Sequence, residues 1–172
     1  AELKLVRHAP YQSVELTKTG DKVALEIIRH HRLLELFLTE DLGYSWDQVH
    51  AEADKLEHII SEEFEDRIAA RLGDPLIDPH GDPIPGKDGT IAAVQQRSLI
   101  DLAAGQSAHI TRVTDGNPEL LRYAAGLGLR PQVHVTLIDA EPFGGLLRLR
   151  IGKIEHSIGR ELAAQIFVSV EK

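Results

Sequence analysis

The chain has 172 residues, of which 42% are hydrophobic and 27% charged, and its formal net charge is −8. This composition is typical of a folded protein with one mid-sized domain or two small ones, and it argues against a disordered or collagen-like chain. The absence of cysteine excludes disulfides, a thiolate nucleophile and every cysteine-based metal site.

The acidity is concentrated in one stretch of the first half. Between Glu40 and Asp66 there are ten carboxylates and a single base, Lys55. Such a field attracts cations and repels phosphate, so we do not expect this stretch to bind nucleic acid. No apolar run reaches the ~20 residues that cross a bilayer, and the N-terminus lacks a secretory signal pattern. We therefore expect a cytoplasmic protein that makes no use of a membrane.

The first residues predict a β-hairpin that leads into a helix. Two short runs of alternating apolar residues flank residues 8–11, His-Ala-Pro-Tyr, a sequence typical of a turn. Thr19 is a suitable N-cap for the helix that follows. Apolar residues then recur at helical spacing, which predicts one long helix over residues 21–42.

Two further helices and a turn-rich connector come next. Ser45 begins a second predicted helix whose apolar residues extend to Ile60, and a third begins near Ser61 and stops at Gly73. The following segment, residues 74–97, contains four prolines, and each proline forces the residue before it out of the helical region. We expect this connector to be a domain boundary.

From residue 98 onward the pattern changes to short strands separated by glycines. One helix is predicted over residues 118–126, and five strands are predicted at 105–113, 132–139, 146–151, 153–158 and 165–170. Short strands in such close succession are typical of a small SH3-like barrel. The expected fold class is therefore α+β, with a helical domain followed by this barrel.

Potential metal ligands lie on the first two predicted helices. Offsets of four, seven and eight residues return to one helix face, so the spacing predicts a row of ligands on the second helix and a matching pair on the first. The six donors are His31 and Glu35 on the first helix, and His50, Asp54, Glu57 and His58 on the second. Either group alone is typical of a solvated acidic face. Both together, on neighbouring antiparallel helices, favour a metal site.

This donor set limits the choice of metal. Imidazole and carboxylate without sulfur suit Mn²⁺ and Fe²⁺, although zinc and copper would bind the same donors on raw affinity. His30 points away from His31 around the helix, so we expect it at the surface or behind the ligands. No metal role is predicted for the other histidines, which are His8, His80, His109, His134 and His156.

Three segments carry a resemblance to a known family. Residues 28–35 (IRHHRLLE), 49–58 (VHAEADKLEH) and 78–85 (DPHGDPIP) closely resemble the diphtheria-toxin-repressor family of iron- and manganese-dependent transcriptional repressors. The resemblance implies a winged helix-turn-helix, a helical metal-binding and dimerisation domain and an SH3-like domain similar to the ferrous-iron-transport A domain. It divides this chain into a wing remnant (1–20), the helical domain (21–73), a proline-rich linker (74–97) and the SH3-like domain (98–172).

The same resemblance assigns the ligands to two sites. His31, Glu35 and His50 match the first, ancillary site, and Asp54, Glu57 and His58 match three ligands of the second, activating site. Asp54 stands where iron-type members have cysteine and manganese-type members have a carboxylate, which favours Mn²⁺, with Fe²⁺ as the alternative. The C-terminal domain of the family adds a carboxylate to the first site, for which Asp115 or Glu119 is placed.

Partners and activity follow from this resemblance. It implies a homodimer that binds operator DNA through a domain expected to be missing from this chain, because residues 1–20 match only the wing. No nucleophile is paired with a base, so no enzymatic activity is expected. A ferritin-like di-metal oxidase or metal-storage protein is the alternative, although its Glu-x-x-His pattern does not occur on these helices. A plain interaction module would show no dependence on metal.

Overall fold

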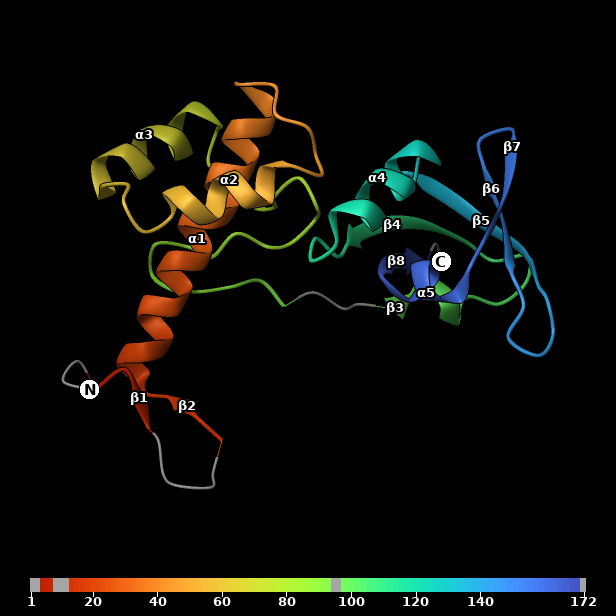
Figure 1. Cartoon of the computed structure of the whole chain (residues 1–172), viewed down its shortest axis with the longest axis horizontal. Coiled ribbons are helices and arrows are strands. Elements are labelled where there is room, and N and C mark those ends of the chain that lie inside the picture. Colours follow the sequence, from red (N-terminus) through yellow and green to blue (C-terminus); the bar gives the residue numbers. More distant parts are fainter. Residues whose placement is uncertain (1–3, 8–12, 94–96, 171–172) are drawn as a thin grey trace.

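The structure is a computed structural model that describes residues 4–7, 13–93 and 97–170. Three helices and a two-stranded hairpin form one part of the molecule, and a six-stranded antiparallel sheet with two short helices forms the other (Figure 1). This arrangement confirms the predicted α+β class. The predicted hairpin turn at residues 8–11, and His8 with it, lies outside the described residues.

The hairpin packs on the start of a long helix. Strands β1 (Val6–Arg7) and β2 (Glu15–Leu16) pair antiparallel, as predicted, and α1 extends over Lys18–Glu40. The N-cap of α1 is Thr17, so the prediction of Thr19 was wrong by two residues. The backbone of Thr17 is extended, and its hydroxyl accepts a hydrogen bond from the N–H of Gly20 at 3.1 Å. Thr17, two residues before the predicted cap, is also a suitable N-cap residue, and the helix begins after it.

Helices α2 (Val49–Leu56) and α3 (Glu62–Arg71) lie against α1. The second helix is shorter than predicted, because residues 57–59 form a turn and Ser61, with extended backbone, caps α3 by accepting from the N–H of Phe64. The apolar faces of these helices enclose a small core. Its buried members are Leu33, Leu34, Leu36, Ala53, Ile68, Ala69 and Ile84.

The sheet has the strand order β3-β8-β4-β5-β6-β7. Its elements are β3 (Arg97–Ser98), η1 (Leu99–Asp101), β4 (Ser107–Val113), α4 (Pro118–Gly126), β5 (His134–Ala140), β6 (Leu147–Ile151), β7 (Ile154–Ile158), α5 (Arg160–Ala164) and β8 (Ile166–Val170). The five predicted strands and helix α4 are confirmed. The sequence did not indicate β3 or α5, since two residues of strand and five of helix are too short to show a period.

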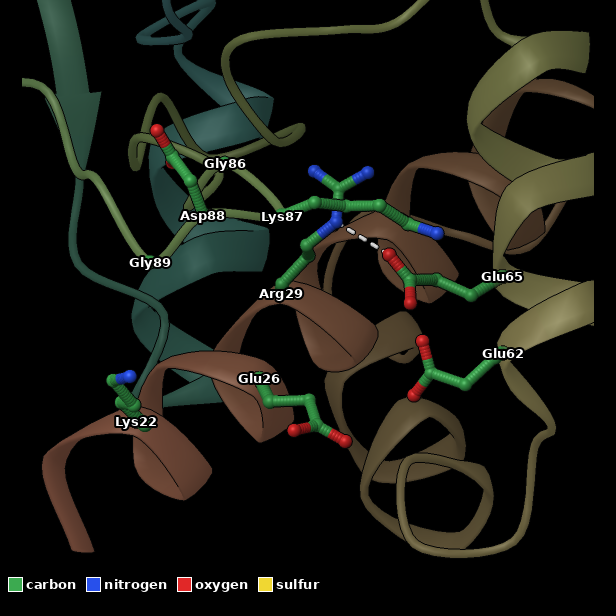
Figure 2. Close-up of a pocket in the computed structure, with 9 residues that line it drawn as sticks. All are labelled: Lys22, Glu26, Arg29, Glu62, Glu65, Gly86, Lys87, Asp88 and Gly89. Carbon is green, nitrogen blue, oxygen red and sulfur yellow. Dashed lines mark hydrogen bonds and ion pairs between the residues drawn. The ribbon is translucent and has the colours of Figure 1, made fainter. Parts of the chain in front are cut away.

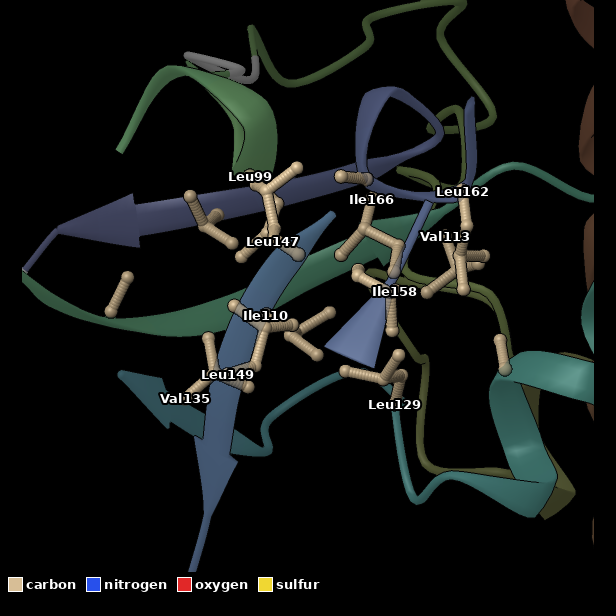
Figure 3. Close-up of a cluster of buried hydrophobic side chains, with 14 of the residues drawn as sticks. Leu99, Ile110, Val113, Leu129, Val135, Leu147, Leu149, Ile158, Leu162 and Ile166 are labelled. Carbon is tan, nitrogen blue, oxygen red and sulfur yellow. The ribbon is translucent and has the colours of Figure 1, made fainter. Parts of the chain in front are cut away.

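The core of this second part consists of inward-facing aliphatic side chains from every long strand (Figure 3). Trp46, in the loop between α1 and α2, also belongs to this core although it comes from the helical part. Its indole N–H donates to the carbonyl of Pro79 at 2.9 Å, and the guanidinium of Arg130 lies 4.9 Å from its ring centre. Trp46 therefore fixes the helical part against the sheet.

Among the residues that the structure describes, no helix is both long enough and apolar enough to cross a membrane. The longest helix, α1, carries charged side chains along its whole length. This finding agrees with the absence of a long apolar run in the sequence.

Gly20 allows the hairpin to approach α1 closely, and this contact can be tested. A Cβ at this position would collide with the backbone oxygen of Leu5. We therefore expect Gly20→Ala to detach the hairpin from the helix, with a loss of about 1–3 kcal/mol at that contact.

The readout is amide hydrogen exchange at Thr17, whose N–H donates to the Leu5 carbonyl at 2.9 Å. Protection of this amide should fall by at least about tenfold in Gly20→Ala. Gly126→Ala is the control, because no atom lies within 4 Å of the added Cβ. Equal protection of Thr17 in both variants would contradict the close approach.

Candidate metal centre

Helices α1 and α2 bring three of the predicted ligands into direct contact. His31 and Glu35 are one turn apart on α1, and His50 lies in the first turn of α2. One carboxylate oxygen of Glu35, Oε1, lies 3.0 Å from His31 Nε2 and 3.1 Å from His50 Nδ1. The two imidazole nitrogens are 2.9 Å apart. These three donors therefore surround one point, as the helical spacing predicted.

A second group of donors lies on the opposite edge of the His31 ring. Nδ1 of His31 is 2.6 Å from Glu57 Oε2 and 3.4 Å from Asp54 Oδ1. The other oxygen of Glu57 lies 3.1 Å from His58 Nε2. His58 is mostly exposed, and both Glu57 and His58 stand in the turn after α2 rather than on the helix, so the prediction that placed these two residues on the helix was wrong. His31 therefore faces the carboxylates of the second group as well as those of the first.

The two C-terminal candidates differ in their position. Asp115, in the segment between β4 and α4, points its carboxylate at the first group, with Oδ2 3.7 Å from His50 Nδ1. Glu35, His50 and Asp115 each offer one ligand atom within 4.8 Å of the others. Glu119 is exposed in the first turn of α4 and belongs to none of the groups of converging donors in the described part of the chain.

Two residues that the sequence analysis did not select complete this arrangement. Asp78 and His80 are buried beside the second oxygen of Glu35, and His80 Nδ1 lies 3.5 Å from Glu35 Oε2. Nε2 of His80 is 3.0 Å from the carbonyl of Trp46, so Nε2 must donate and the neutral ring presents the lone pair of Nδ1 to Glu35. The alternation of acidic residues and histidine in Asp-Pro-His-Gly-Asp was the signal that could have identified both.

The loop that carries Asp78 and His80 is held rigidly. Oδ1 of Asp78 accepts hydrogen bonds from the backbone N–H groups of His80 and Asp82 at 2.8 and 2.9 Å, which fixes a tight turn. The carbonyl of His80 accepts from the N–H of Val113 in β4 at 2.9 Å. Gly81 has a φ of +93°, and a Cβ there would collide with the backbone of β4. Only glycine permits this approach.

Electrostatics around Glu35 favour a bound cation. Burial opposes protonation of His31, but its hydrogen bonds with Glu35 and Glu57 and their charges outweigh this and raise its pKa to about 9. Burial would raise the pKa of Glu35, yet its contacts with His31 and His80 lower it to about 2. Burial and the charge of Glu35 raise the pKa of Asp78 to about 7. Without metal, protons on imidazoles supply the positive charge that Glu35 requires.

The residues present fit a divalent cation. Glu35 Oε2, Asp78 Oδ2 and His80 Nδ1 are buried and make no hydrogen bond with the described residues. Their ion-pair contacts are long, 3.5 Å between Glu35 Oε2 and His80 Nδ1 and 3.6 Å between Asp78 Oδ2 and Arg32 Nε. Buried polar atoms held only by such contacts are under-satisfied, and the three residues each offer one ligand atom within 4.8 Å of the others. Nitrogen and oxygen donors without sulfur suit Mn²⁺ or Fe²⁺.

The remaining histidines lie outside this centre. His30 lies on α1, is buried and faces Glu65 of α3, so it is not at the surface. His109 and His134 are cross-strand neighbours on β4 and β5, with ring centres 5.2 Å apart. His156 lies on β7.

Comparison with protein families divides the chain into two matches. Residues 17–86 match the model of the iron-dependent repressor metal-binding and dimerisation domain. Residues 97–170 match the FeoA domain. The first match contains the helices and the loop with Asp78 and His80, and the second contains the sheet and Asp115.

Individual relatives agree with this division. The chain is 33% identical to the iron-dependent repressor IdeR of Mycobacterium tuberculosis over 181 residues, a region that covers 98% of this chain and 77% of IdeR. It is 39% identical over 104 residues to the diphtheria toxin repressor of Corynebacterium diphtheriae, which covers 58% of this chain and 46% of that one.

Solved structures show the same fold with similar coverage. A manganese-dependent transcriptional repressor in complex with manganese superimposes with a TM-score of 0.90 and 38% identity over 99% of this chain and 79% of that one. The manganese regulator SloR superimposes with a TM-score of 0.81 and 29% identity over 98% of this chain and 78% of that one.

The raised pKa of His31 predicts how metal binding depends on pH. Only the neutral imidazole offers a lone pair, so an ion that binds His31 must displace a proton whenever the pH is below about 9. The apparent affinity for Mn²⁺ should therefore fall as the pH falls, by about tenfold per pH unit for one displaced proton. Calorimetric titration with Mn²⁺ between pH 8 and pH 6 measures this slope, and a flat profile would contradict it.

Proposed function

This chain belongs to the iron-dependent repressor family, and from that premise we propose that it is the metal-sensing and dimerisation portion of a Mn²⁺-dependent repressor that binds operator DNA. Its relatives and structural neighbours are metal-dependent transcriptional repressors, not enzymes, and they include iron-dependent and manganese-dependent members. The observation that carries the proposal is the buried Glu35, whose two oxygens face separate imidazoles. We place the protein in the cytoplasm, where a repressor meets DNA.

The proposed first site is organised around Glu35. Its proposed ligands are Glu35 itself and the donors grouped around its two oxygens, namely His31, His50, Asp78, His80 and Asp115. We retain Asp54, Glu57 and His58 as ligands of the second site, with His31 beside them. We leave Glu119 out of the first site, because Asp115 already supplies the carboxylate from the C-terminal part.

Metal selection follows from the chemistry of these donors. All of them are imidazole nitrogens or carboxylate oxygens, and hard or borderline ions such as Mn²⁺ and Fe²⁺ accept such a set. Asp54 offers oxygen at the position where iron-type members are expected to have cysteine, which favours Mn²⁺. When bound, the ion supplies the positive charge that protons supply in its absence.

The chain's own residues connect this charge to the rest of the repressor. His31 and Glu35 belong to α1, His50 to α2, His80 to the loop after α3, and Asp115 to the segment after β4. Holding these donors together therefore joins the helical part to the sheet. The same helix α1 contacts the hairpin at its first turn, so it links the centre to the wing of a DNA-binding domain. An ion shifts the population toward DNA binding only by its preference for the competent arrangement.

The ferritin-like alternative receives no support. That architecture takes its ligands from four helices. Here the donors come from two helices, two loops and a turn. One of them, Asp115, belongs to the part of the chain that contains the antiparallel sheet. The relatives are repressors. We therefore set this alternative aside.

Replacement of His50 tests the first site. The side chain is 37% exposed and belongs to no hydrophobic core, and Glu35 keeps His31 and His80 as partners, so His50→Ala should leave the fold intact. Loss of groups that merely orient ligands costs about 10–100-fold in affinity, so loss of a ligand should cost at least that. Calorimetry with Mn²⁺ should show one binding event weakened by this factor. His156→Ala is the matched control, and equal isotherms for both variants would remove His50 from the site.

Dimerisation is the other testable part of the proposal. Ile59, in the turn after α2, and Phe64, on α3, are 74% and 44% exposed, so both large apolar side chains of the helical part are available to a second copy. We propose that a second copy covers them in a two-fold dimer. The double variant Ile59→Glu/Phe64→Glu should sediment at the monomer mass of 19.0 kDa. Ile154→Glu, at a position on β7 that is 63% exposed, should retain the mass of the parent. A parent protein that is itself monomeric would contradict the proposal.

A further inference from the structure

One carboxylate in the loop after α3 binds arginines from both parts of the molecule. Asp82 is buried, and its Oδ1 accepts a hydrogen bond from Arg32 of α1 at 3.4 Å and another from Arg112 of β4 at 3.2 Å. The side chains of the two arginines are largely buried as well, at 20% and 17% exposed. We call these three residues the Asp82 bridge, since they connect the helical part to the sheet.

The loop is also held to the helices by contacts that do not involve the carboxylate of the bridge. Arg32 donates a further hydrogen bond to the carbonyl of Pro83. Arg29, one turn earlier on α1, donates to the carbonyl of Pro85 at 2.8 Å and pairs with Glu65 of α3 (Figure 2). The loop would therefore stay bonded to α1 if the carboxylate of the bridge were lost.

The sheet side of the loop depends more strongly on the pair between Asp82 and Arg112. The guanidinium of Arg112 lies 4.1 Å from the ring centre of Phe167 on β8, so its charge is partly withdrawn from water. Its Nε is buried without a hydrogen-bond partner among the described residues. Removing one partner of a desolvated pair leaves the other charge uncompensated, which costs more than the loss of an exposed pair. Loss of the Asp82 carboxylate should therefore weaken the contact between the loop and the sheet.

The bridge needs no metal, because its positive charges come from arginines. It nevertheless determines where metal donors lie, since the loop of Asp82 carries His80, and β4 leads into the segment that carries Asp115. We propose that the Asp82 bridge docks the sheet on the helices in the absence of metal, so that an ion finds the donors around Glu35 already assembled. This inference rests on the proposed function, since it takes that centre as a metal site. An assembled site binds more tightly, because the ion does not contribute to the cost of assembly.

Apolar packing is the competing explanation for docking. Trp46 belongs to the core of the sheet and donates to the carbonyl of Pro79 in the loop, so these contacts alone could join the two parts. The two explanations differ when the charge of Asp82 is removed. If the bridge docks the sheet, docking becomes weaker without metal, and an ion that binds donors from both parts favours the docked state again. If Trp46 alone docks the sheet, removal of the charge has no effect.

Amide hydrogen exchange at Val113 measures docking, because its N–H donates to the carbonyl of His80 at 2.9 Å across the two parts. Asp82→Asn keeps the shape of the side chain and removes its charge. Without metal, we expect Val113 to be protected in the parent and its protection to fall at least about tenfold in Asp82→Asn. Saturating Mn²⁺ should raise the protection again. Asp139→Asn is the matched control, because it removes the same charge from an ion pair between two strands of the sheet, and it should leave Val113 unchanged.

Two further readouts separate docking from general stability. The amide of Leu137 donates to the carbonyl of Gln106 at 3.0 Å within the second part of the molecule, so it should stay protected in Asp82→Asn. The double variant Asp82→Asn/Arg112→Leu removes both charges and leaves no unpaired guanidinium at this contact. It should therefore recover part of the Val113 protection that Asp82→Asn loses.

Two outcomes would overturn the proposal. Equal protection of Val113 in Asp82→Asn and the parent without metal would assign docking to Trp46 alone. Loss of protection at Leu137 together with Val113 would mean that Asp82 supports the fold in general. A fall at Val113 alone that Mn²⁺ does not reverse would support the bridge and contradict the metal centre of the proposed function, so the two claims fail separately.

Discussion

The structure depends on the burial of one carboxylate. Glu35 has no exposed surface, so both of its oxygens must find positive charge inside the protein. One oxygen faces His31 and His50 from the helices, and the other faces His80 from the loop after α3. Protons on imidazoles satisfy this requirement in part, which the pKa of about 9 for His31 reflects. A divalent ion at Glu35 would satisfy it with greater charge, and we propose this exchange as the chemical basis of metal sensing.

This requirement also explains how two small folds act together. The loop of Asp78 and His80 is bonded to β4 through Val113 and stacks His80 on Trp46, which in turn packs in the core of the sheet. Asp82 in the same loop forms ion pairs with Arg32 of α1 and Arg112 of β4. The loop beside Glu35 is therefore bonded to both the helical part and the sheet, so a change of charge at Glu35 acts on contacts of both. Because the N–H of Thr17, the N-cap of α1, donates to the carbonyl of Leu5, the same helix connects the centre with the hairpin.

The sequence predicted those parts of this arrangement that repeat along the chain. The long periodic pattern of α1 and the alternating strands of the sheet were recognisable, and so was the pairing of His31 and Glu35 with His50. Asp78 and His80 were missed because their role depends on a loop folding back under Glu35, a contact between distant residues that no local period records. His58 was predicted on the second helix, but α2 ends at Leu56 and the chain turns there before Ser61 caps α3. Short elements such as β3 could not be predicted, because two residues are too few to show a periodic pattern.

The proposed function requires that a metal ion binds at Glu35, between the helices and the loop. Anomalous diffraction at the manganese absorption edge, from crystals of this chain grown with Mn²⁺, locates the ion directly. We expect a strong peak within bonding distance of the Glu35 carboxylate, in contact with imidazole nitrogen from His50 or His80. Manganese peaks confined to the exposed acidic surface, with none at Glu35, would contradict it.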